Sequence, residues 1–187
     1  MKPSFLLFAL SFVALGPVIA AENPTPGRTP EPAPVATMSA AECEVWDRER
    51  SFAKSVEQHD ATAFAEHVHA QTVFEAGSDS PLRGHATVMQ EWKPIVEGKI
   101  PLRWHPGFVS IGGKSDLALS SGPAWIENPE ASTESRFRVG SYVSTWIKDA
   151  DGAWRVLFDR SGAPLRAVST DEATKLIATL PTECPRA

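Results

Sequence analysis

The sequence has little cysteine and tyrosine and holds no run of basic residues. Its 187 residues include 2 Cys and 1 Tyr, and 18 Lys and Arg stand against 23 Asp and Glu, for a net charge of −5. A chain with a negative net charge and no basic patch is not expected to bind nucleic acid or an anionic membrane surface as its main partner.

Several motifs that mark well-known chemistries are also missing. There is no Gly-rich phosphate loop, no nucleophile elbow and no CxxC pair, which argues against nucleotide-dependent, serine-hydrolase and thiol-redox activities. The three central histidines, His67, His69 and His105, are not spaced to share one helix face with a carboxylate. The sequence therefore predicts neither a cofactor nor a metal site.

The N-terminal segment is typical of an exported protein. Lys2 precedes an apolar run from Phe5 to Ala14, Gly16-Pro17 interrupts it, and small residues precede a cut after Ala20. We interpret residues 1–20 as a signal peptide that is too short to anchor the chain. This predicts a periplasmic or secreted protein that does not associate with the membrane once the signal is removed.

A proline-rich linker and one domain are expected to follow. Residues 21–38 contain closely spaced prolines and almost nothing to bury, so they are interpreted as a disordered linker. The folded domain is placed at residues 39–187. In an oxidising compartment, Cys43 and Cys184 are expected to form a disulfide rather than a metal pair. Two unrelated thiols are the alternative.

Helical patterns dominate the first half of the domain. Ser39 and Glu42 form a capping box, and an apolar stripe continues to about Gln58. Further helices are predicted from Ala61 to about Ala70, over residues 85–93 and over residues 169–180.

Strand patterns dominate the second half. The clearest is a hairpin over residues 140–164, in which Tyr142, Ser144 and Trp146 share one face of the first strand. In the second strand, alternation puts Asp159 on the face opposite Trp154 and Phe158. Shorter strands are predicted over residues 72–75, 102–111, 116–121 and 124–127. Helices followed by strands indicate an α+β domain with helices on one face of a mainly antiparallel sheet.

The order and wording of these segments resemble the nuclear-transport-factor-2-like (NTF2-like) superfamily, in particular its SnoaL-like and DUF4440 branches. The resemblance covers roughly residues 42–164 and is carried by EVWDRERSFAKSVEQHDATAFAEH, VFEAGSDSPLRGHATVMQEW, LRWHP, LALSSGP and GSYVSTWIKDADGAWRVLFDRSGAP. It implies a cone in which a curved, mainly antiparallel sheet wraps helices on its concave face and a pocket opens between them. It also implies a homodimer formed through the outer face of the sheet, where Trp154 or Ile147 is expected to lie.

The superfamily includes isomerases, dehydratases, polyketide cyclases and binding or assembly modules, so the fold alone constrains function weakly. Proton transfer in such a pocket needs a carboxylate or imidazole and a hydrogen-bond donor. Asp159 is the candidate acid or base, with Tyr142, Ser144 or His67 as its partner. The alternatives are an Asp159 ion pair with an arginine, and core packing of Tyr142 and His67.

Six tryptophans are many for one domain and favour a pocket for an apolar or aromatic molecule. The predicted ligand-binding residues are Trp92, Trp104, His105, Trp125, Ser144 and Trp146. In the alternative interpretation the tryptophans fill the interior completely. The sequence thus predicts a module that binds a small apolar or aromatic ligand. A cofactor-independent isomerase, dehydratase or cyclase that uses Asp159 is the alternative.

Overall fold

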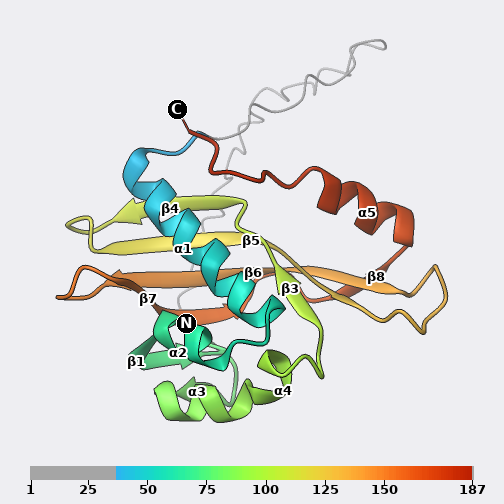
Figure 1. Cartoon of the computed structure of the whole chain (residues 1–187), viewed down its shortest axis with the longest axis horizontal. Coiled ribbons are helices and arrows are strands. Elements are labelled where there is room, and N and C mark those ends of the chain that lie inside the picture. The colour runs from blue at the N-terminus through green and yellow to red at the C-terminus, as the bar shows by residue number, and fades with distance from the viewer. Residues whose placement is uncertain (1–36, 187) are drawn as a thin grey trace, which may run out of the picture. The chain divides into compact units, whose positions relative to one another are not determined.

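The computed structural model describes residues 37–186, so the predicted signal peptide and nearly all of the predicted linker lie outside the described residues. The described part is an α+β unit in which helices come first and most strands follow (Figure 1). The helices are α1 (Ala40–Glu57), α2 (Ala61–His67), α3 (His85–Glu91), α4 (Lys93–Val96) and α5 (Thr170–Ala178). The strands are β1 (Val68–Phe74), β2 (Leu82–Arg83), β3 (Leu102–Trp104), β4 (Phe108–Gly112), β5 (Leu117–Glu127), β6 (Phe137–Lys148), β7 (Trp154–Ser161) and β8 (Arg166–Val168).

The sheet is a curved, unclosed and mainly antiparallel layer. Its strand order is β2-β1-β7-β6-β5-β3, with β4 paired to β5 and β8 paired to β6. Among the pairs in this sheet, β1 and β7 are parallel. The long helix α1 crosses the sheet on its concave side, while α2, α3 and α4 gather at the β1 end (Figure 1).

The helix α1 forms where the capping box predicts. The Ser39 backbone N–H donates to Glu42 Oε2 (2.8 Å), and Glu42 N–H donates back to Ser39 Oγ (3.3 Å). These two bonds satisfy N–H groups that the first helical turn leaves free. The helix buries its apolar stripe against the sheet, and residues such as Trp46 and Phe52 are almost wholly buried.

Segment boundaries differ from the sequence prediction in several places. The second helix stops at His67, and the first strand begins directly after it at Val68 instead of at Thr72. The predicted helix over residues 85–93 is followed by one further turn, because Pro94 is accommodated early in α4. The segment 116–127 is one continuous strand, and the short strand β8 has no clear signal in the sequence.

A bulge in β7 corrects the predicted faces of this strand. Thr145 pairs with Phe158, but the next residue, Trp146, pairs with Val156, so Leu157 is an extra residue in the ladder. The side chains that follow therefore exchange faces. Phe158 becomes 43% exposed on the outer face, and Asp159 joins Trp154 and Val156 on the inner face, contrary to simple alternation.

The sequence predicts helices on one face of the sheet, but the structure has a helix on each face. The helix α5 packs on the outer face of the sheet, where Ala173 and Ile177 join a second apolar cluster with Trp125, Phe137 and Val168. Beyond α5 the chain returns to α1, and Cys184 forms the predicted disulfide with Cys43. Within residues 37–186, no helix is long and apolar enough to cross a membrane.

Candidate functional site

The inner face of the sheet and the helices enclose a cavity of about 220 Å³. Most of its wall is apolar or aromatic. The apolar and aromatic lining residues are Phe52, Trp92, Ile95, Ile100, Leu102, Trp104, Ala124, Ile126, Tyr142, Ala163 and Leu165. The polar lining residues are Glu75, Ser141, Asp159, Arg160 and Ser161. A cavity of this kind, apolar with a few converging polar groups, is the usual form of a small-molecule site.

Asp159 places a carboxyl group in this wall because the β7 bulge turns it inward. Ser144 Oγ, on the neighbouring strand, donates a hydrogen bond to Asp159 Oδ2 (2.6 Å). Among the described residues, no Lys, Arg or His side chain forms an ion pair with Asp159. Burial raises the pKa of Asp159 to about 6, although the Ser144 hydrogen bond lowers it, and the nearby charge of Glu75 raises it further.

Tyr142 also borders the cavity, but its hydroxyl is not bonded to Asp159. Instead it lies 2.9 Å from the Ser120 hydroxyl on β5. Burial raises the pKa of Tyr142 well above its ordinary value, and the nearby carboxyl of Glu49 adds to this effect. Tyr142 is thus a neutral hydroxyl in the wall, while Ser144 is the residue that contacts the Asp159 carboxylate.

Glu49 is a buried acid that sequence reasoning did not select. It projects from α1 with no exposed surface, and its two oxygens accept hydrogen bonds from Trp104 Nε1 (2.7 Å) and Trp146 Nε1 (2.8 Å). Burial raises its pKa to about 7, partly offset by the two indole donors. A signal was present, because Glu49 occupies the apolar stripe of α1 three residues before Phe52.

The predicted ligand-binding residues separate into two groups. Trp92 and Trp104 line the cavity. Trp146 and Ser144 are wholly buried behind the wall, and Trp125 lies on the outer face under α5. The cavity therefore uses two of the predicted aromatic residues together with Phe52 and Tyr142, whereas Trp146 packs the main core and Trp125 the second cluster under α5.

The buried histidines are held as core residues. His67 Nδ1 bonds the carbonyl of Ala63 (2.6 Å), its Nε2 bonds Ser51 Oγ (2.7 Å), and its ring stacks on Phe52. Burial lowers the pKa of His67 to about 4. His105 contacts the Pro106 carbonyl (2.9 Å) and packs against Trp46. Neither histidine borders the cavity.

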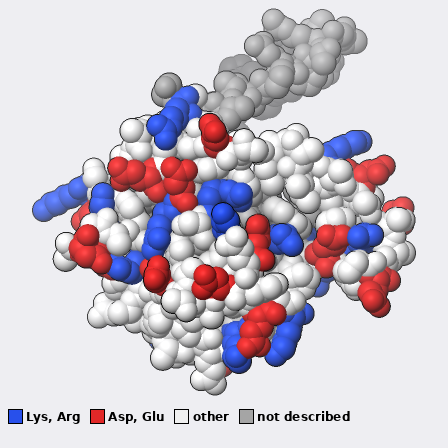
Figure 2. Space-filling view, viewed as in Figure 1, with Lys and Arg blue, Asp and Glu red and all other residues white. Residues whose placement is uncertain are grey.

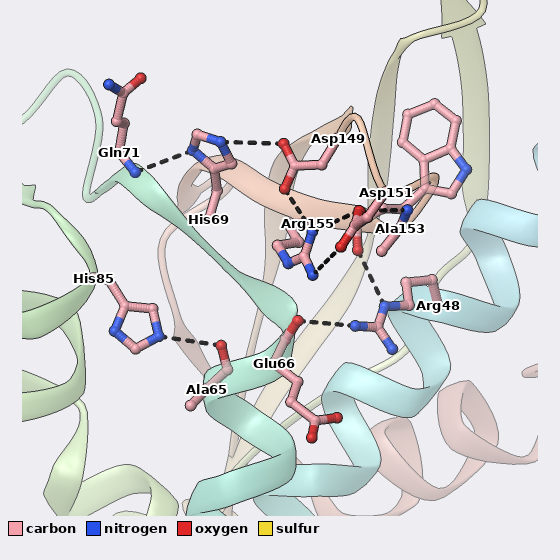
Figure 3. Close-up of polar contacts among 11 residues, drawn as sticks. Arg48, Ala65, Glu66, His69, Gln71, His85, Asp149, Asp151, Ala153 and Arg155 are labelled. Atoms are coloured by element: carbon pink, nitrogen blue, oxygen red, sulfur yellow. Dashed lines mark hydrogen bonds and ion pairs between the residues drawn. The ribbon is translucent and has the colours of Figure 1, made fainter.

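His69, near the start of β1, belongs to a separate polar cluster with the turn between β6 and β7 (Figure 3). Its Nδ1 accepts the Gln71 backbone N–H (3.0 Å), and its Nε2 lies 3.3 Å from Asp149 Oδ1. Arg155 then bridges Asp149 (2.6 Å) and Asp151 (2.9 Å). Within the described residues no three His, Cys, Asp or Glu side chains are grouped to hold a metal ion.

The outer face of the sheet differs in part from the prediction that Trp154 or Ile147 lies there. Trp154 is only 6% exposed and packs in the main core, so it does not lie on that face. Instead Leu119 (43%) and Phe158 (43%) are exposed there, next to Leu117 and the half-buried Ile147. Leu119 on β5 and Phe158 on β7 lie on either side of β6, because both pair with Thr145.

Comparison with known proteins supports the fold and no specific activity. No protein-family profile and no curated protein matches the sequence. Among solved structures, an NTF2-like protein of unknown function from Pseudomonas putida KT2440 has 16% identity and a TM-score of 0.56, over 72% of this chain and 98% of that chain.

Two further solved structures carry provisional activity assignments. One, from Shewanella frigidimarina, is named provisionally as a ketosteroid isomerase and has 14% identity and a TM-score of 0.52, over 67% of this chain and all (100%) of that chain. The other, from Streptomyces avermitilis, is named provisionally as a dehydratase of the NTF2-like family, with 12% identity and a TM-score of 0.50, over 65% of this chain and 95% of that chain. At such low identity the likeness shows the fold alone, and this fold is NTF2-like.

Proposed function

We propose that the protein binds a small apolar or aromatic molecule in the cavity. The observation that carries this proposal is an aromatic cavity of about 220 Å³ with a single inward carboxyl group from the strands, Asp159. A dry cavity of about 150 Å³ holds a benzene molecule, and drug-sized ligands occupy about 300 Å³ or more. One ring with a short substituent fits this volume.

Filling the cavity tests this proposal. Ala163 lines the cavity and its side chain is exposed, so Ala163→Trp is expected to occupy the cavity without disturbing the core. Affinity for single-ring probes such as 2-phenylethanol, measured by calorimetry, should fall at least about tenfold. The matched control is Ala178→Trp on the exposed side of α5. Equal affinities in both variants would contradict binding in this cavity.

A second candidate function is proton transfer by Asp159, in an enzyme of the isomerase, dehydratase or cyclase type. The supporting observation is a cavity-facing carboxyl group with a raised pKa, a serine hydroxyl within hydrogen-bond reach and no neutralising cation. Such a group is poised to exchange a proton near neutral pH. Tyr142 would supply a neutral hydroxyl to a developing oxyanion.

A test for catalytic turnover distinguishes a binding module from a proton-transfer enzyme. Wild type and Asp159→Asn would be compared for deuterium exchange at the carbon next to the carbonyl of small cyclic ketones. Exchange in wild type, with loss in Asp159→Asn and ligand binding retained, is the outcome expected of an enzyme. Binding without exchange in both proteins leaves a binding module.

We also propose export to the periplasm or the medium and membership of the SnoaL-like or DUF4440 branch. The Cys43–Cys184 disulfide supports export, because disulfides persist in oxidising compartments. Mass spectrometry of protein recovered after osmotic shock should find a mature chain that begins at Ala21. A chain that keeps Met1 in the cytoplasmic fraction would contradict export.

A further inference from the structure

We propose that the natural ligand of the cavity is a small amine, whose ammonium group contacts Asp159 and whose apolar part contacts the aromatic wall. This inference rests on the proposed binding function and names its ligand class. Three features of the cavity carry it: an incompletely bonded carboxylate, aromatic side chains in the same wall, and more acidic than basic lining groups.

The Asp159 carboxylate has free capacity for a hydrogen-bond donor. An ionised carboxylate can accept about four hydrogen bonds, and in the described residues one side-chain hydroxyl, that of Ser144, donates to it. A buried carboxylate is costly unless it is paired and hydrogen-bonded. A ligand that brings a positive charge with two or three N–H donors would supply both. A neutral apolar ligand would leave the carboxylate as it is.

The wall that surrounds Asp159 is suited to a cation. Phe52, Trp92, Trp104 and Tyr142 all line the same cavity, and the electron-rich faces of such rings attract ammonium groups. Two of these rings are fixed by their surroundings. Trp104 is held by its hydrogen bond to Glu49, and Trp92 packs edge-on to Phe74. Fixed rings bind with little loss of side-chain entropy.

The charges that face the site favour a cation as well. Glu75 follows β1 at the rim, and Glu49 lies behind the Trp104 wall. Among the lining residues the basic side chain is Arg160, which is exposed and contacts the Ser161 carbonyl (3.3 Å) rather than Asp159. The lining acids are thus Asp159 and the exposed Glu75, against one exposed arginine, and the buried Glu49 lies behind the wall.

Amines and ligands that offer a carbonyl oxygen are expected to bind with opposite dependences on pH. Asp159 must be ionised to bind an ammonium, so amine affinity should fall as pH decreases through about 6, the pKa of Asp159. Alkyl amines stay protonated across this range because their pKa is near 10. A ligand that offers a carbonyl oxygen instead needs protonated Asp159 as a donor, and its affinity would rise as pH decreases.

The experiment compares ligands of one size that differ in charge. Affinities of 2-phenylethylamine, 2-phenylethanol and phenylacetate would be measured by calorimetry at pH 7.5 and pH 5. In wild type at pH 7.5 we expect the amine to bind at least about tenfold more tightly than the alcohol, and phenylacetate to bind most weakly. Asp159→Asn should remove the advantage of the amine and leave the alcohol affinity within about twofold. Asp79→Asn, in the exposed loop after β1, is the control.

The outcomes distinguish this inference from the proposed function. If the alcohol binds as tightly as the amine, or if amine affinity rises at pH 5, the amine inference is wrong while binding in the cavity stands. If no probe binds wild type, the proposed function fails and this inference fails with it. Should Asp159→Asn not fold, as judged by circular dichroism, the pH trend of wild type alone decides.

Discussion

Two carboxyl groups on the inner side of the sheet, the wholly buried Glu49 and the half-buried Asp159, form no ion pair with a basic side chain of the described residues. Glu49 relies on two indole N–H groups and Asp159 on one serine hydroxyl. Neutral donors compensate a buried negative charge only in part, and for this reason burial raises both pKa values toward neutrality. Both residues therefore respond to pH in the range where the protein is expected to work.

We predict that Glu49 makes stability fall as pH rises. Its pKa is 4.5 in the unfolded chain and about 7 in the folded protein. The folded state binds the proton more tightly, so this contribution is fully present below pH 4.5 and is lost as pH rises through about 7. Glu49→Gln removes it. The stability gap between wild type and this variant should shrink between pH 5 and pH 8, by up to about 1.4 kcal/mol per pH unit.

Urea unfolding at several pH values measures this gap, with Asp47→Asn on the exposed side of α1 as the control. The comparison with wild type is needed because His67 acts in the opposite direction. Burial lowers the pKa of His67 to about 4, so stability is lost as pH falls below 6.5. A gap that stays constant across the range would contradict the prediction for Glu49.

At the scale of elements, the pairing of β3 and β4 with β5 depends on a close approach between the backbone of β5 at Gly122 and the backbone of residues 105–107. A Cβ atom on Gly122 would lie 2.0 Å from the His105 carbonyl oxygen and 2.7 Å from the Gly107 nitrogen. Here the link between β3 and β4 runs alongside β5, with the His105 N–H donating to the Pro123 carbonyl (3.0 Å) and the Gly107 N–H to the Ser121 carbonyl (2.9 Å). The missing side chain lets both short strands pair with β5, and β3 supplies the Trp104 wall of the cavity.

Gly122→Ala is therefore expected to destabilise the protein by at least about 1–3 kcal/mol, because backbone atoms must move apart. Gly112→Ala in β4 is the matched control, since a Cβ there meets nothing within 4 Å. It should leave stability unchanged or raise it by up to about 1 kcal/mol. Thermal unfolding of both variants measures the difference. Equal melting temperatures would show that the close backbone approach at Gly122 does not require a glycine.

The disulfide joins the segment after α5 to the first turns of α1, across 141 residues of sequence. Closing a loop of this length stabilises the folded state by about 5 kcal/mol in the chain-entropy model. The double variant Cys43→Ser/Cys184→Ser should lose about 2–5 kcal/mol in urea unfolding. Labelling of denatured, non-reduced wild type should find no free thiol, and two reactive thiols would disprove the bridge.

At the scale of the whole molecule, charge and apolar surface are distributed differently. Figure 2 shows acidic and basic side chains interspersed over the viewed face, with no large area of one sign. The outer face of the sheet instead exposes Leu117 and Leu119 on β5 and Phe158 on β7, on either side of β6. Exposed apolar patches of this kind mark interaction surfaces, so we propose a homodimer that pairs these faces about a twofold axis.

Leu119→Lys is predicted to abolish that dimer, because the twofold axis would bring two buried charges together. Light scattering at micromolar concentration should give a dimer mass for wild type and a monomer mass for the variant. Gln58→Lys, an exposed position at the end of α1, is the control and should remain dimeric. A wild type that is monomeric at this concentration would count against the proposal.

The sequence by itself determined features that depend on local patterning. The capping box placed the start of α1, the period of two placed Tyr142, Ser144 and Trp146 on one face, and the ordered segments indicated an α+β fold of the NTF2-like kind, which the solved structures support. The positions of Cys43 and Cys184 near the ends of the domain indicated the disulfide. The cap and the strand pattern are carried by residues close in sequence, and the disulfide was indicated because the chain has two cysteines and a predicted export signal.

The tertiary structure decided the contents of the site. Alternation put Asp159 and Trp154 on opposite faces of β7, whereas both face inward, because a bulge at Leu157 depends on how β6 and β1 pair with β7 and leaves no local mark. Whether a tryptophan lines the cavity, as Trp104 does, or fills the core, as Trp146 does, depends on curvature and helix packing. Glu49 acquired its surroundings from strands 55 and 97 residues further along the chain, a separation that no sequence pattern spans.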